Sequence, residues 1–258
     1  MSENWPPLDL HAHVEATVAP HDLLALRAVV FAACRTLAES RQALDRQSSD
    51  LLTVWGVGVH PAVKEALESF DLAVFTSLIG RSAYVAEVGL DGKVKSRLPQ
   101  QQEVLAEVLV ALQANPRITS LHSYAATNEL VELLQDIPID GAVLHWWLGD
   151  AVATRRAVEL GAYFSVNAGG LKHAEVLSLI PIERLLTETD HPAGDRTSPQ
   201  PRQPGNVSKV EKGLASIHGI RPFEMRRLCW SNLHTLVAST GVARLLPPGV
   251  GSVVAAAG

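Results

Sequence analysis

Cysteine is scarce in this chain of 258 residues, which contains only Cys34 and Cys229. Two cysteines so far apart in the sequence favour free thiols in a reducing, cytoplasmic setting over a disulfide-stabilised secreted fold. The N-terminal segment has no basic stretch followed by an apolar one, so we expect no secretion signal. The apolar run at residues 23–33 is interrupted by Arg27, so we expect no membrane-spanning segment and no membrane partner.

An excess of positive charge is also missing, because 22 Lys and Arg residues stand against 27 Asp and Glu residues. The net charge of −5 at pH 7 argues against a protein that coats nucleic acid by electrostatic attraction. It does not argue against a nuclease, since bound cations reverse the local field at an acidic site. The chain does contain 47% hydrophobic residues, which suits one large domain with a substantial core.

Short apolar or β-branched runs alternate with longer amphipathic stretches along the chain, which is typical of βα units in a parallel sheet. Strands are predicted at residues 8–13, 28–33, 53–59, 84–90, 118–122, 141–146, 162–166 and 184–189. Helices are predicted between them at residues 101–114, 128–134, 151–160 and 171–179. This order predicts an α/β fold, a single (β/α)₈ TIM barrel over residues 1–244, followed by a flexible tail at residues 245–258.

Residues of the types that bind metal ions lie at the predicted strand ends. His11 and His13 share one side of the first strand, because side chains alternate along a strand. Glu87 lies inside an apolar strand, where an isolated carboxylate is costly without a partner charge. The full set is His11, His13, Glu87, His122, His145 and Asp190. Because the carboxyl ends of barrel strands converge on one rim, this set predicts a metal site rather than unrelated core histidines and capping acids.

Six short motifs surround these residues between positions 8 and 237: H-A-H, G-V-H-P, E-V-G-L-D-G, L-H-S, V-L-H-W and T-E-T-D-H-P. In this order the chain resembles the TatD-like metal-dependent deoxyribonucleases, a branch of the amidohydrolase-like barrels. More narrowly, V-L-H-W-W, Y-F-S-V-N and R-L-L-T-E-T-D-H-P are similar to the TatD-type component of Qat antiphage defence systems.

The resemblance implies two divalent metal ions. One would be held by His11, His13 and Asp190, the other by His122 and His145, with Glu87 as a bridge. Mixed imidazole and carboxylate ligands suit zinc, manganese, nickel or iron, and four histidines make magnesium less natural, so the metal stays open. Asp190 is the candidate to accept the proton of an attacking water, with a role as ligand only as the alternative.

Four further residues are candidates for contacts around the metal ions. His60, in G-V-H-P, fits the family position that faces the substrate, and a structural cap is the alternative. Glu188 shares a side of its strand with Asp190, so it either orients a ligand histidine or pairs with a base such as Arg184. Asp91 has the same two interpretations. Asn167 either donates to a substrate oxygen or is a turn residue.

The proline-rich loop at residues 192–205 follows the eighth strand and either covers the barrel mouth or is a surface connection. Within it, Arg202 is a candidate to bind phosphate, although the arginine–asparagine pair of the family is not kept. The basic residues at positions 93–97 either contact a nucleic-acid backbone or form a solvated charge run. Alternation along the strand places Trp146 and Trp147 on opposite sides. Either one of them offers a face for base stacking while the other packs outward, or both only pack against the protein.

Together these features predict a metal-dependent hydrolase, most simply a deoxyribonuclease that cleaves DNA phosphodiester bonds with a water activated by two metal ions. The narrower resemblance adds an expected role in antiphage defence with Qat-type partner proteins. Two alternatives stay open: a hydrolase of a small amide, lactone or nucleotide, and a subunit of a defence complex whose activity depends on its partners.

Overall fold

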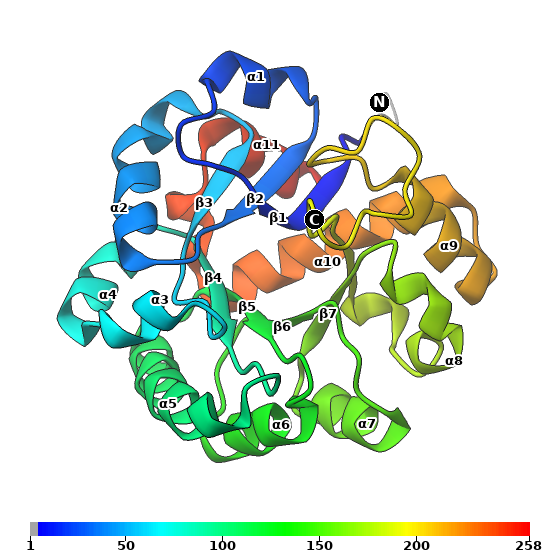
Figure 1. Cartoon of the computed structure of the whole chain (residues 1–258). Helices are drawn as coiled ribbons and strands as arrows, with labels where there is room; N and C mark the ends of the chain where they lie inside the picture. Colours follow the sequence, from blue (N-terminus) through cyan, green and yellow to red (C-terminus); the bar gives the residue numbers. More distant parts are fainter. Residues whose placement is uncertain (1–4) are drawn as a thin grey trace.

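The computed structural model describes residues 5–258, in which eight parallel strands follow one another in the order β1 to β8. Residues 1–4, which belong to the N-terminal segment in which we expect no secretion signal, lie outside the described residues. The strands form a nearly closed ring with helices on its outside (Figure 1). They are β1 (Leu8–His13), β2 (Val29–Ala33), β3 (Thr53–Val57), β4 (Tyr84–Gly89), β5 (Ile118–His122), β6 (Ala142–His145), β7 (Tyr163–Val166) and β8 (Leu185–Thr187). The predicted strands are confirmed, with differences of one or two residues at some ends.

The helices lie between and after the strands. They are α1 (Pro20–Ala25), α2 (Leu37–Arg46), α3 (Lys64–Glu68), α4 (Leu72–Ile79), α5 (Leu98–Ala114), α6 (Thr127–Asp136), α7 (Ala151–Glu159), α8 (Ala174–Leu177), α9 (Ser208–His218), α10 (Pro222–Thr240) and α11 (Pro248–Ala256). Short 3₁₀ turns are η1 (Gln47–Ser49), η2 (Lys95–Arg97), η3 (Gly170–His173), η4 (Ile182–Arg184) and η5 (Val242–Leu245). The helix predicted at residues 171–179 is divided into η3 and α8. Within residues 5–258, no helix is long and apolar enough to cross a membrane.

Backbone hydrogen bonds join the segment after β8 to β1. The N–H of Asp190 donates to His11 O at 2.8 Å, and the N–H of His13 donates to His191 O at 3.0 Å. These bonds bring the last strand back beside the first, so the fold is the predicted (β/α)₈ TIM barrel. They also place the residues after β8 next to the two histidines of β1.

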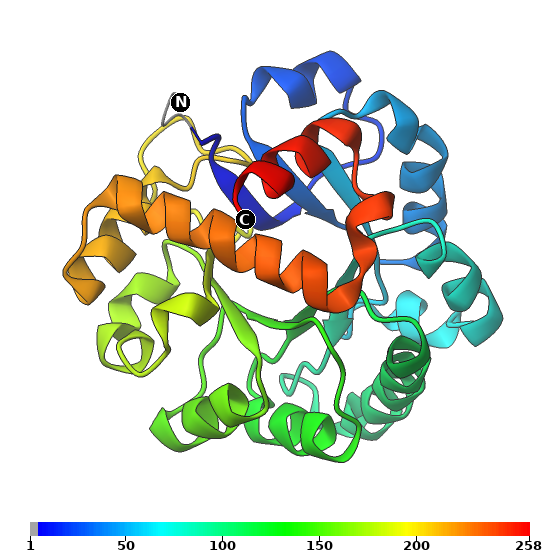
Figure 2. The same cartoon turned by 180° about the vertical axis from the view of Figure 1, so that it is seen from behind.

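Helix α10 crosses the barrel at the amino ends of the strands (Figure 2). Its Trp230 indole N–H donates to Pro6 O at 2.8 Å, and its Asn232 amide donates to Leu185 O at 2.8 Å. The amino ends are therefore closed, and the carboxyl ends form the mouth, where the functional groups of such barrels gather.

Residues 248–256 form α11, which differs from the flexible tail predicted for residues 245–258. Val250 and Val254 are buried, and the His234 ring on α10 donates to Val254 O at 3.0 Å. A spacing of four residues places both valines on one face of the helix. Packing against α10 supplies the stability that so short a helix lacks in isolation, so the barrel core extends past residue 244.

Candidate metal centre

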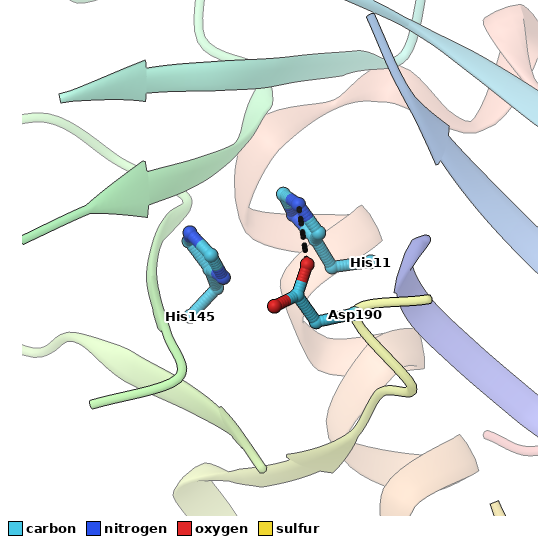
Figure 3. A group of neighbouring side chains, drawn as sticks. All are labelled: His11, His145 and Asp190. Atoms are coloured by element: carbon cyan, nitrogen blue, oxygen red, sulfur yellow. Dashed lines mark ion pairs between the residues drawn. The ribbon is translucent and has the colours of Figure 1, made fainter. Parts of the chain in front are cut away.

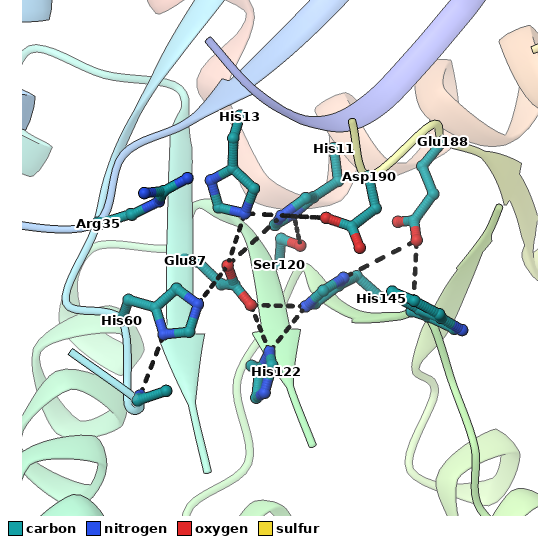
Figure 4. Close-up of polar contacts among 12 residues, drawn as sticks. His11, His13, Arg35, His60, Glu87, Ser120, His122, His145, Glu188 and Asp190 are labelled. Atoms are coloured by element: carbon teal, nitrogen blue, oxygen red, sulfur yellow. Dashed lines mark hydrogen bonds and ion pairs between the residues drawn. The ribbon is translucent and has the colours of Figure 1, made fainter. Parts of the chain in front are cut away.

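The six predicted ligands converge at the mouth of the barrel around Glu87, which is only 1% exposed (Figure 4). Glu87 Oε2 lies 3.2 Å from His13 Nε2 and 3.6 Å from His11 Nε2. Glu87 Oε1 lies 2.8 Å from His145 Nε2 and contacts His122 Nδ1. The carboxylate therefore meets imidazoles through both of its oxygens, which suits a group that bridges two cations.

Asp190 completes the cluster from the segment after β8. Its Oδ1 lies 3.9 Å from His11 Nε2 and 3.8 Å from His13 Nε2. The rings of His11 and His145 stack with centroids 4.1 Å apart, and the Asp190 carboxylate lies beside them (Figure 3). Asp190 has a φ of 43°, in the left-handed region, and its N–H bond to His11 O holds that conformation.

Several buried polar atoms of this cluster have no hydrogen-bond partner among residues 5–258: His11 Nε2, His13 Nδ1, Glu87 Oε2 and His145 Nδ1. Each such atom costs about 1–3 kcal/mol when it is left unpaired. A concentration of them in one place therefore indicates that another group completes the site. Three sets of ligand atoms lie within 4.8 Å of one another, namely His11–His145–Asp190, His11–His13–Glu87 and His60–Glu87–His122. Imidazole and carboxylate atoms at such separations fit divalent cations.

His145 lies between the two ion positions that the family resemblance implies. It joins His11 and Asp190 in one set of ligand atoms, although the resemblance pairs it with His122. Its Nε2 nevertheless lies only 3.3 Å from His122 Nδ1, and both nitrogens contact Glu87 Oε1. The positions of the side chains thus allow His145 to serve with either group.

His60 follows β3 and faces the same cluster, with Nε2 3.3 Å from Glu87 Oε2. Its Nδ1 accepts the N–H of Ala62 at 3.1 Å. A neutral imidazole that accepts at Nδ1 carries its proton on Nε2, and a protonated nitrogen does not bind a cation. Burial lowers the pKa of His60 to about 4, so the ring is neutral at pH 7. This tautomer favours a hydrogen-bond donor at the mouth over a metal ligand.

Contacts on the far side of the ligand rings fix their orientation. His11 Nδ1 lies 2.7 Å from Ser120 Oγ, which turns Nε2 toward the cluster. His122 Nε2 lies 3.3 Å from Asp91 Oδ2, which turns Nδ1 toward Glu87, and this hydrogen bond lowers the pKa of Asp91. Asp91 therefore contacts one of the candidate ligand histidines, and the geometry favours this interpretation over the alternative of an ion pair with a base.

Glu188 lies against the other side of the cluster. Its Oε1 accepts the N–H of Trp146 at 3.0 Å and lies 3.8 Å from His145 Nδ1. The alternative partner, Arg184, precedes β8 at the opposite end of the barrel and donates to Gly161 O at 2.9 Å. Of the two interpretations, the geometry favours the one in which Glu188 orients His145 and the chain that follows it.

Asn167 does not lie where a substrate contact requires. Its side chain is fully buried, its amide nitrogen donates to Glu188 Oε1 at 2.9 Å, and its Oδ1 accepts the N–H of Gly170 at 3.0 Å. Because both ends of the amide are engaged inside the protein, the structure replaces the predicted substrate role with one in positioning Glu188. The sequence places Asn167 after β7 but does not reveal the direction of its side chain.

The cluster perturbs its own carboxyl groups in opposite directions. Burial raises the pKa of Asp190 to about 7, against the opposing effect of His145. Burial also acts to raise the pKa of Glu87, but His60, His145 and His122, which are cationic in the acid range where Glu87 titrates, outweigh it and hold that pKa well below its usual value. Glu87 is therefore a permanent negative charge, whereas Asp190 needs added positive charge nearby to ionise fully at neutral pH.

Two cavities meet at His13, which lines both. The smaller, of about 230 Å³, lies over the ligand cluster, and the larger, of about 690 Å³, lies beside it. Arg35, two residues after the end of β2, lines the larger cavity near His13 (Figure 4). The sequence analysis missed Arg35, although a polar residue at a strand end is the signal that identified the ligands. Within the described chain, exposed Arg202 lines neither cavity, so its predicted phosphate contact is not supported.

The loop at residues 192–205 does reach the mouth, since Pro192 and Pro204 line the larger cavity. Buried Asp9 joins the last residue of this loop to the segment that precedes it. Its carboxylate accepts the N–H of Thr189 and the N–H of Gly205, each at 2.7 Å. Asp9, in D-L-H-A-H, is thus a further residue that positions the site, and its place one alternation before His11 was the available signal.

A barrel with imidazoles and carboxylates gathered at the carboxyl ends of its strands defines a metal-dependent hydrolase. The chain belongs to the family of TatD related DNases, whose model matches residues 8–238. The 3'-5' ssDNA/RNA exonuclease TatD of Klebsiella pneumoniae is 33% identical over 174 residues, which cover 60% of this chain and 64% of that protein. The human deoxyribonuclease TATDN3 is 24% identical over 253 residues, which cover 87% of this chain and 92% of that protein.

Solved structures share the fold at lower identity. YJJV, a TatD homolog from Escherichia coli K12, has a TM-score of 0.78 and 22% identity, covering 89% of this chain and 96% of that chain. An uncharacterized amidohydrolase from Saccharomyces cerevisiae has a TM-score of 0.70 and 16% identity, covering 89% and 100%. These likenesses confirm the TIM-barrel fold. Since the match spans only 64% of the K. pneumoniae relative, the substrate of that protein is not by itself established for this chain.

Proposed function

We propose that this protein is a metal-dependent deoxyribonuclease that hydrolyses DNA phosphodiester bonds with an activated water. The observation that carries the proposal is a group of buried nitrogen and oxygen atoms around Glu87. Within residues 5–258 these atoms have no hydrogen-bond partner, and they are of the kinds that bind metal ions. Family membership supports the reaction class. The names of the relatives support the substrate, since one is an exonuclease of ssDNA and RNA and another a deoxyribonuclease.

Two divalent ions fit the ligand set best, because Glu87 offers one oxygen to each side of the cluster. The ligands would be His11, His13 and Asp190 for one ion, and His122 and His145 for the other. When bound, the ions neutralise the charge of a phosphodiester and acidify the attacking water. Zinc, manganese, nickel or iron suits these ligands better than magnesium.

The side chains of the mouth divide the remaining work. Asp190 Oδ1 lies at the rim beside His11 and His13, where it reaches the attacking water and accepts its proton. His60 presents Nε2–H to a phosphate oxygen. Arg35 adds a permanent positive charge from the neighbouring cavity, a role for which the sequence had suggested Arg202.

The test combines metal analysis with DNA hydrolysis. The purified chain is analysed for bound metal and incubated with labelled single- and double-stranded DNA and each candidate ion. We expect wild type to shorten DNA, and Asp190→Asn and Glu87→Gln to lower the rate by more than about 100-fold, beyond the effect of residues that only orient a ligand. Glu132→Gln, at an exposed acid on α6, is the charge-matched control. Equal hydrolysis by all variants would reveal a contaminating nuclease and contradict the proposal.

A hydrolase of a small amide, lactone or nucleotide is the second candidate, favoured by the modest size of the cavity over the cluster. Two bound ions without hydrolysis of any DNA would support it. Comparison of bis(4-nitrophenyl) phosphate with simple lactones and amides would then identify the reaction class.

We also propose, from the motifs V-L-H-W-W, Y-F-S-V-N and R-L-L-T-E-T-D-H-P, that the chain acts in the cytoplasm as the TatD-type component of a Qat antiphage system. Its free, buried cysteines suit a reducing compartment. Exposed Leu72 and Val110 line a groove between α4 and α5 that is open to a partner protein. Co-purification with other Qat proteins, and loss of phage protection in Glu87→Gln cells, would support this role. Full protection by that variant would contradict it.

A further inference from the structure

One wall of the small cavity is aromatic and apolar. Tyr124 lies two residues after His122, the last residue of β5. Trp146 directly follows His145, the last residue of β6, and Leu148 lies two residues further on. Tyr124 is 51% exposed and Leu148 is 37% exposed, so both offer apolar surface to whatever enters. The wall thus begins within three residues of two of the proposed ligands.

The fold turns Trp146 into this cavity. Its φ of 38° lies in the left-handed region, and its N–H is tied to Glu188. A Cβ added at Gly169 would lie 3.2 Å from Trp146 Cζ2, so the glycine leaves the indole its place. Trp147, by contrast, packs outward, with its indole N–H donating to Thr154 Oγ1 at 2.8 Å. The alternation predicted for the two tryptophans therefore has a clear outcome: one is core and the other lines the site.

The chemistry of the wall selects its occupant. Within the described chain, the cavity lining contains no lysine or arginine, so the wall is not built for a phosphate. Exposed aromatic faces bind planar rings by stacking, and stacking tolerates any base because each has a π-face. A phosphate held at the ligand cluster carries its own nucleoside, whose base lies only one sugar away. A planar, uncharged ring is therefore the group that reaches Tyr124 and Trp146.

We propose that Tyr124, Trp146 and Leu148 form a nucleobase subsite that binds the base of the nucleotide whose phosphate is cleaved. This inference rests on the proposed phosphodiesterase function and adds a requirement to it. A base inside a duplex has both faces stacked on its neighbours, so it must be unpaired before it can enter the subsite.

The experiment compares two matched oligodeoxynucleotides, one with a normal terminal nucleotide and one with an abasic tetrahydrofuran in its place, prepared separately for each end. For wild type, we expect the abasic group at the processed end to raise KM by roughly ten-fold, in the range of one lost base–aromatic stack. Tyr124→Ala should raise KM for the normal oligonucleotide by a similar factor and leave KM for the abasic one unchanged. Tyr124→Phe, which keeps the ring, should restore the lower KM.

Phe223→Ala removes another partly exposed aromatic, at the start of α10 on the opposite side of the barrel, and is the matched control. Trp146→Phe is a second variant that tests the wall. It keeps an aromatic ring at position 146, where the backbone has a positive φ. Equal KM values for normal and abasic ends, or a Tyr124→Ala effect that persists on the abasic oligonucleotide, would overturn the subsite.

Binding separates failure of the subsite from failure of the proposed function. Fluorescence anisotropy with the Asp190→Asn variant measures oligonucleotide affinity without turnover. If no DNA is cleaved, the nuclease proposal fails, yet a preference of this variant for the base-bearing end would still support the subsite. If DNA is cleaved but both ends bind equally, the nuclease proposal stands and the subsite is wrong.

Discussion

The two ends of the barrel bury charged side chains in opposite ways. At the amino ends, Arg226 of α10 donates to both carboxylate oxygens of Glu211, at 2.6 Å and 2.7 Å, and to Trp5 O at 3.1 Å. At the carboxyl ends, Glu87 Oε2 has no hydrogen-bond partner among residues 5–258, although imidazoles surround it. Buried charge is compensated within the protein where donors and acceptors are matched, and it is available for chemistry where the set is incomplete.

Among the predictions that test this difference between the two ends, removal of metal should have the largest effect. We expect a chelator to abolish DNA hydrolysis and to lower the Tm by about 10–20 °C, because each of two ions present at 100 times its Kd stabilises the folded state by about 2.7 kcal/mol. Elemental analysis, calorimetry and a rate assay before and after chelation measure the effect, and Zn²⁺ or Mn²⁺ should restore both properties. An unchanged rate and Tm after verified removal would contradict a metal centre.

Asp91→Asn should weaken metal binding by about 10–100-fold, because the hydrogen bond to His122 Nε2 orients a proposed ligand. Competition against a chromogenic chelator measures the affinity. Asp136→Asn, an exposed acid on α6, controls for the change in net charge. The same affinity in both variants would mean that Asp91 has only a structural role.

Arg35→Ala and Arg202→Ala compare two exposed arginines that differ in their distance from the mouth. Arg35 lines the large cavity beside His13, so its loss should raise KM for DNA about ten-fold, as expected for one charge-assisted contact. Arg202→Ala should change KM less than about two-fold. Steady-state kinetics at one fixed salt concentration measures both KM values. A larger increase in KM for Arg202→Ala than for Arg35→Ala would show that Arg202 makes the phosphate contact.

Arg226→Met should have the smallest effect on chemistry and a clear effect on stability. Because the Arg226 side chain is partly exposed, we expect a loss of about 2–3 kcal/mol in the free energy of unfolding, less than for a fully buried pair. Metal content and kcat at 25 °C should not change. Urea titration and rate assays on the same sample provide the comparison, and a lowered kcat in fully folded protein would show that the two ends are coupled.

The strands and the ligand cluster were predictable because their signals are local. In L-D-L-H-A-H, alternation along one strand places His11 and His13 on the same side, and the structure brings both to Glu87. His122 and His145 end short apolar runs, so a strand end identified both the residue and the rim that it faces. The same logic applied to Arg35 would have found it, since it lies only two residues after the end of β2.

Loop side chains were the part that sequence reasoning could not place. Asn167 and Arg202 carry the right chemistry for a substrate contact, but one is buried against Glu188 and the other lies outside both cavities. Their directions depend on residues far away in the sequence. The prediction of a flexible tail was wrong for a similar reason. The burial of Val250 and Val254 depends on packing against α10, which the sequence of the tail does not reveal.

The sequence by itself determined the barrel, the family and the set of imidazoles and acids at its mouth. Only the tertiary structure decided the tautomer of His60, the burial of Asn167, the inward turn of Trp146 and the docking of α11. The physical reason is how far apart in the sequence the interacting residues lie. Strand periodicity follows from neighbours in the chain, whereas the partner of a loop side chain is set by segments that meet only after folding.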